Sequence, residues 1–64
     1  MTQKELAYVE DAIGHEENII KICNESLKKI EDESLKEFLQ NEVNTHTNMK
    51  EKLLYLLEVK SNEW

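Results

Sequence analysis

The sequence contains no proline, a single glycine and a single cysteine among its 64 residues. Without proline, and with only Gly14, the chain has almost none of the residues that punctuate turns, which favours long helices over short strands. Cys23 cannot form a disulfide within the chain, so a reducing, intracellular environment is expected, with an intermolecular cross-link as the alternative. These absences predict an all-α protein.

Basic side chains and long apolar runs are also scarce. The chain has eight basic and fourteen acidic residues, which gives a formal charge of −6. Binding to a phosphate backbone depends on lysine and arginine, so this balance disfavours it. The longest apolar run, residues 53–57, is far short of the roughly 18 residues that a membrane span needs, and the start of the chain has no basic and apolar signal sequence. We therefore expect a soluble, cytoplasmic protein with neither nucleic acid nor membrane as partner.

Catalytic patterns are missing as well. Ser26 and Ser34 have no histidine at helical spacing to activate them as nucleophiles. A single glycine cannot make the glycine-rich loop that holds phosphates. We expect no enzymatic activity, no catalytic residues and no bound cofactor.

Two apolar stripes repeat at steps of three and four residues, the period of an amphipathic helix. The first consists of Leu6, Val9, Ile13, Glu16, Ile20, Cys23, Leu27 and Ile30. The second consists of Leu35, Leu39, Glu42, His46, Met49, Leu53 and Leu56. They predict helices over about 3–30 and about 34–61, joined by a turn at about 31–34, so that residues 1–64 form a single helical-hairpin domain.

Hydrogen-bonding side chains mark both predicted helix starts. Thr2 and Glu5 have the spacing of a capping box, in which each side chain accepts from the other residue's backbone N–H. Ser34 and Glu37 repeat this spacing, but Asp32 is a competing N-cap for the second helix. The sequence leaves this choice open.

A short turn makes the helices antiparallel neighbours, so that stripe residues whose numbers add up to about 65 or 66 should lie opposite each other. This register places Cys23 opposite Glu42, Ile20 opposite His46 and Glu16 opposite Met49. The three polar stripe residues, Glu16, Glu42 and His46, therefore fall in consecutive central layers. The ends of the hairpin should be apolar and its middle polar.

For a chain of this length a single hydrophobic core is marginal, so a disulfide, a metal or an oligomeric partner is expected. Further apolar residues flank the two stripes, and two helices cannot cover them. We predict that two hairpins form a four-helix bundle, a homodimer with two-fold symmetry, or a larger oligomer. The predicted dimer interface consists of Tyr8, Ala12, Ile19, Ile22, Phe38 and Tyr55.

Several segments resemble a known family. The run from Lys4 to Glu16, which contains Tyr-x-Glu-Asp-Ala-x-Gly-His-Glu, is followed by Cys23, by residues 32–36 and by His46. Together they resemble small ferritin-like proteins of endospore-forming bacteria that are related to the spore coat protein F family. The resemblance spans nearly the whole chain and implies a ferritin-like fold, a sporulation context and a structural role in the spore coat, with other coat proteins as partners. It implies no catalytic residues.

A metal centre is the alternative function. Di-iron four-helix bundles use a glutamate from each of two helices and a Glu-x-x-His motif from each of the other two. Here Glu42 and His46 are four residues apart, and Thr45 stands where the motif has histidine. Still, residues four apart share a helix face, so a dimer could gather Glu16, Glu42 and His46 as ligands for iron, zinc or manganese.

The plainer interpretation, which we favour, is a polar layer that fixes register and oligomeric state. In a third interpretation, Glu16 or Glu42 rotates to the rim and is solvated. Cys23 is expected to be a small buried apolar residue. Gly14 is explained either by a close approach of the helices or by simple tolerance of an exposed glycine, and Trp64 either folds back onto the apolar open end or docks on a partner.

Overall fold

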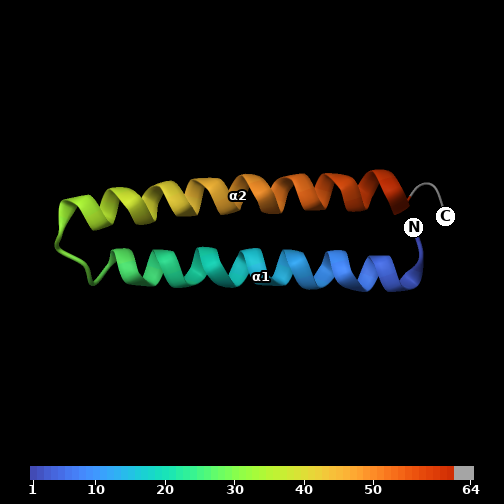
Figure 1. Cartoon of the computed structure of the whole chain (residues 1–64), viewed down its shortest axis with the longest axis horizontal. Coiled ribbons are helices and arrows are strands. Elements are labelled where there is room, and N and C mark those ends of the chain that lie inside the picture. The colour runs from blue at the N-terminus through green and yellow to red at the C-terminus, as the bar shows by residue number, and fades with distance from the viewer. Residues whose placement is uncertain (62–64) are drawn as a thin grey trace.

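The computed structural model describes residues 1–61 and contains two helices, α1 (Gln3–Leu27) and α2 (Glu33–Ser61). They lie side by side and antiparallel, joined by a short loop at one end, with the start of the chain at the other end (Figure 1). The molecule is a rod of 48 × 15 × 11 Å. The predicted all-α hairpin is confirmed, and the described residues contain no strand.

Helix α1 begins as predicted and ends earlier. Thr2 is its N-cap, and the capping box is complete, because Thr2 Oγ1 accepts from the Glu5 N–H at 3.0 Å and Glu5 Oε1 accepts from the Thr2 N–H at 2.8 Å. The predicted end near residue 30 is wrong by three residues. The N–H of Lys28 bonds to the carbonyl of Glu25 at 3.3 Å, a tight three-residue closure that ends the helix.

Helix α2 begins at Glu33, so the turn occupies residues 28–32 and not 31–34. Asp32, the competing candidate, is the capping residue, because its Oδ1 accepts from the Leu35 N–H at 2.9 Å. Ser34 therefore lies inside the first turn. The physical reason is that a cap two residues earlier already accepts from a first-turn amide, so the helix begins before Ser34.

The seam between the helices holds a very small core. Among the described residues only Ile13 and Cys23 are buried, with the remaining stripe residues partly or largely exposed. The expected burial of Cys23 is confirmed, and its thiol is free. A hairpin has a single contact line, so each helix can cover no more than one stripe of the other.

Three further expectations concern single features. Gly14 has no atom of another element within 4 Å of the position a Cβ would take, so a close approach of α2 within the hairpin does not explain it. Trp64 lies outside the described residues. Within residues 1–61, neither helix combines the length and the apolar character that crossing a membrane requires.

Candidate functional site

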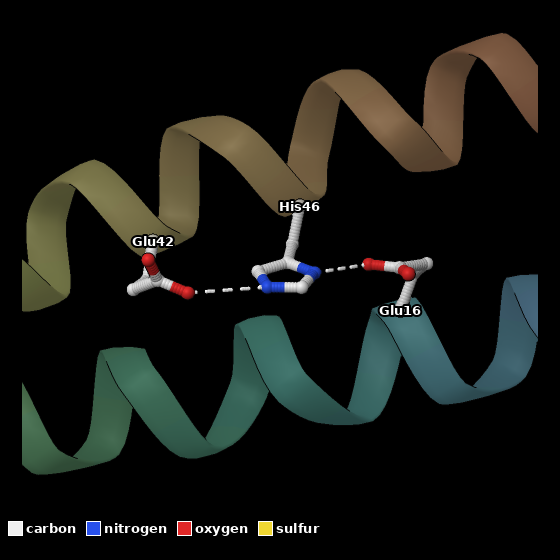
Figure 2. Close-up of polar contacts among 3 residues, drawn as sticks. All are labelled: Glu16, Glu42 and His46. Carbon is white, nitrogen blue, oxygen red and sulfur yellow. Dashed lines mark hydrogen bonds and ion pairs between the residues drawn. The ribbon is translucent and has the colours of Figure 1, made fainter.

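Three polar side chains meet in the middle of the seam. The Nδ1 of His46 lies 2.5 Å from Oε2 of Glu16 on α1, and its Nε2 lies 3.3 Å from Oε2 of Glu42, one turn earlier on α2. Figure 2 shows the ring of His46 held between the two carboxylates, which approach it from opposite sides. We call these three residues the central triad.

The helical spacing of the residues explains the convergence. Glu42 and His46 are four apart and share a face of α2, while Glu16 follows Ile13 by three residues on the seam stripe of α1. The expected central layers thus bring the three polar residues together. One detail differs from the predicted register. The register placed Glu16 opposite Met49, whereas the Glu16 carboxylate contacts His46. A glutamate side chain is long enough to reach a partner about one turn away.

The triad is largely shielded from solvent. The side-chain exposure is 12% for Glu16, 18% for His46 and 37% for Glu42. No buried side-chain nitrogen or oxygen in the described part of the chain lacks a hydrogen-bond partner. The interpretation in which Glu16 rotates to the rim is therefore not observed, whereas Glu42 does lie at the edge of the seam.

The two carboxylates favour the charged form of His46. The hydrogen bond to Glu16 is the main reason that the pKa of His46 lies above its ordinary value, and the negative charges of Glu16 and Glu42 act in the same direction. Desolvation by the packed helices opposes this rise. When doubly protonated, the ring donates one N–H to each carboxylate, and the triad has a formal charge of −1.

The same geometry bears on the metal alternative. The three proposed ligands do meet, but a histidine ligand needs a ring nitrogen with a free lone pair, and both nitrogens of His46 face carboxylates. Within residues 1–61, no group of three or more histidine, cysteine, aspartate or glutamate side chains is arranged to hold a metal ion. Metal binding to a single hairpin would require the triad to rearrange.

Sequence reasoning missed a second contact between the helices. Lys50 Nζ on α2 lies 3.1 Å from Oε2 of Glu17 on α1. Neither residue belongs to the predicted stripes, although the numbers 17 and 50 add up close to the hairpin register, and this sum was the available signal. The ion pair marks one edge of the seam as polar.

The six residues of the predicted dimer interface divide into two groups. Tyr8, Ile22, Phe38 and Tyr55 are exposed by more than half of their surface, as an unpartnered face requires, whereas Ala12 and Ile19 are partly buried by the hairpin itself. Large apolar residues outside this set are exposed too: Leu35, Met49, Leu54 and Leu56.

Comparison of the chain with known proteins found no matching family model, no matching curated protein and no matching solved structure. The similarity to spore coat proteins therefore remains an expectation from the sequence.

Proposed function

We propose that this chain is a non-enzymatic structural or interaction protein that works by self-association. In this proposal two hairpins pair through their apolar faces into a four-helix bundle with two-fold symmetry. One observation carries the proposal: eight large hydrophobic side chains are at least 43% exposed, while only two apolar residues in the described chain are buried. Surfaces of this kind mark interaction sites.

Four of these exposed residues share one side of the hairpin. On α1, Tyr8 and Ile22 lie about a quarter turn away from the seam stripe. On α2, Phe38 and Leu56 lie about a quarter turn from the line of contact in the same rotational sense along the chain, and because the helices are antiparallel this is the same side. We call it the apolar face. The Glu17–Lys50 ion pair lies at the other edge, so the two sides differ in polarity.

The apolar face continues into a hollow at the open end. This hollow has a volume of about 360 Å³ and is lined mostly by apolar side chains from both helices, including Tyr8, Val9, Leu56 and Leu57. A second copy of the hairpin offers a surface of matching length and chemistry. Pairing through this face would bury apolar area that the single hairpin leaves in water, and such burial is the main favourable term in association.

The biological setting is the second part of the proposal. The resemblance of residues 4–16, Cys23 and His46 to spore coat related proteins supports a role in sporulation or in the spore coat, with other coat proteins as further partners. A small rod that assembles through one face suits a structural layer. This part rests on the sequence alone.

Oligomeric state tests the proposal directly. Sedimentation of tag-free protein should give a dimer or larger oligomer, and Phe38→Glu should weaken association by more than about tenfold, since it places a charge on the apolar face. Asn18→Glu is the matched control, because it adds the same charge on an exposed outer position of α1 and should leave association unchanged. A wild-type protein that stays monomeric at high concentration would contradict the proposal.

Native mass spectrometry separates this function from the metal-binding alternative. Spectra are recorded before and after addition of zinc, iron(II) or manganese, and each reports chain number and bound metal together. An oligomer of unchanged mass agrees with the structural function. Stoichiometric metal that disappears in His46→Gln would favour the metal-binding bundle, whose candidate ligands are Glu16, Glu42 and His46.

A further inference from the structure

A protruding ring and a hollow lie at equal distances from the centre of α2. Phe38, which is 59% exposed, stands five residues after Glu33, the first residue of the helix. Leu56, in the wall of the open-end hollow, stands five residues before Ser61, the last. At a rise of 1.5 Å per residue, both are about 13 Å from the middle of the helix. They belong to the same apolar face, toward opposite ends of the rod (Figure 1).

A two-fold axis perpendicular to the rod at its middle would bring the two features together. If two apolar faces stack with their loops at opposite ends, Phe38 of each copy lies over Leu56 of the other. The hollow has a volume of about 360 Å³ and a mostly apolar wall, so a phenyl ring can enter it. With the loops at the same end, the two hollows would face each other, and Tyr8, the aromatic ring there, already forms part of each wall.

The distribution of charge along the rod favours a second copy as the occupant. Residues 3–17 have five acidic and one basic side chain, whereas residues 18–29 have one acidic and three basic. Residues 31–46 have five acidic and one basic side chain, whereas residues 47–61 have two acidic and three basic. When the loops lie at opposite ends, each acidic half runs along the basic half of the same helix in the other copy, and such complementarity favours the matched partner. Parallel hairpins would match α1 with α2 in charge as well, so the hollow decides the orientation.

We propose that two hairpins pair with their loops at opposite ends, and that Phe38 of each copy fills the open-end hollow of the other. This inference rests on the proposed self-association and specifies its geometry. The hollow is then a site that only the second copy completes. An aromatic side chain in an apolar pocket is a typical anchor of a protein interface, because it buries a large area with few rotatable bonds.

A double-mutant cycle on the dissociation constant of the oligomer tests this contact. Phe38 and Leu56 lie about 27 Å apart along one helix, too far to interact within a copy, so coupling between them must cross the interface. Sedimentation equilibrium of the full chain gives the constant for the wild type, Phe38→Ala, Leu56→Ala and the double variant. We expect each single change to weaken association by about tenfold. The double variant should associate at least about threefold more tightly than the product of the single effects implies.

Leu54→Ala is the matched control for Leu56→Ala. Leu54 lies on the same helix and is similarly exposed, 43% against 50%. It follows Lys50 by four residues and therefore lies on the side of the Glu17–Lys50 ion pair, away from the hollow. Its effect should combine with that of Phe38→Ala without coupling. Circular dichroism of every variant shows whether the helices persist, so that unfolding is not mistaken for dissociation.

Distances between spin labels report the orientation independently. Glu31→Cys places a label in the loop and Asn18→Cys places one near the middle of α1, each combined with Cys23→Ala to remove the native thiol. Pulsed electron paramagnetic resonance should separate the two loop labels of a dimer by most of the 48 Å length of the rod. The central labels are the matched control, because the middles of the two rods lie together in either orientation and should give a clearly shorter distance.

The outcomes separate this inference from the proposed function. A stable oligomer in which the loop labels are as close as the central labels would overturn the proposed orientation and leave self-association intact. Absence of coupling between Phe38→Ala and Leu56→Ala would overturn the contact and leave the hollow to another occupant, such as Trp64 of the same chain. A monomer at every concentration would overturn the proposed function itself.

Discussion

The middle of the helix seam differs from its two ends in both burial and chemistry. Ile13 and Cys23, the two buried apolar residues of the described chain, lie on either side of Glu16 along α1. Leu35 near the loop and Leu56 near the open end remain about half exposed. The best-packed part of the hairpin thus encloses its charged contact, and the apolar ends are loosely covered.

This difference indicates separate roles for the two regions. A slip of one helix along the other would leave the charges of Glu16 and His46 without partners in a poorly hydrated place, which is costly. The same slip at the ends would exchange one half-exposed apolar contact for another. We infer that the middle determines the register, whereas the ends need a further partner to be buried fully.

Truncation of Ile13 should produce the largest effect on the middle region. Ile13→Ala removes a side chain that is only 9% exposed and leaves a void beside the triad, so we expect the free energy of unfolding to fall by about 3 kcal/mol. Urea denaturation followed by circular dichroism measures this change. Leu54→Ala, at a position 43% exposed, is the matched control and should cost clearly less. Equal losses would show that the middle is no better packed than the ends.

The next effect is the dependence of stability on pH. Folding raises the pKa of His46, so the triad's stabilisation is fully present below the unfolded value of about 6.5 and is lost as the pH rises through the folded pKa. At fixed protein concentration, we expect thermal unfolding to move to lower temperature between about pH 6 and 9. His46→Gln should abolish this shift, and His15→Gln should retain it. A wild-type midpoint that stays constant or rises over this range would contradict the role of the triad.

The sequence predicted much of this arrangement because helical spacing is a local property. Steps of three and four placed Glu16, Glu42 and His46 on the facing stripes, and the capping box at Thr2 needs only four consecutive residues. The end of α1 was not predictable in the same way, because Ile30 continues the apolar stripe while no glycine or proline marks the stop. The contact between His46 and Glu16 depends on side-chain reach across the seam, which a residue-by-residue register does not contain.

A smaller, site-specific effect distinguishes the two carboxylates. Glu16 makes the shorter contact and is the principal cause of the raised pKa of His46, so Glu16→Gln should lower that pKa more than Glu42→Gln does. Titration of the two histidine rings by NMR measures both changes at once. His15 is exposed and serves as the internal reference. An equal fall of the His46 pKa in the two variants would show that Glu16 and Glu42 stabilise the charged ring equally.

The smallest expected effect tests whether helix propensity or packing governs the region beside the triad. Gly14 precedes Glu16 by two residues and is exposed, and an added Cβ would meet no atom within 4 Å. Gly14→Ala should therefore raise the free energy of unfolding by up to about 1 kcal/mol, because alanine restricts the unfolded chain and favours the helix. Thermal and urea unfolding measure the gain. If Gly14→Ala instead weakens the oligomer while the helices persist, the second copy must approach α1 closely at this point, and the boundary of the apolar face would extend to Gly14.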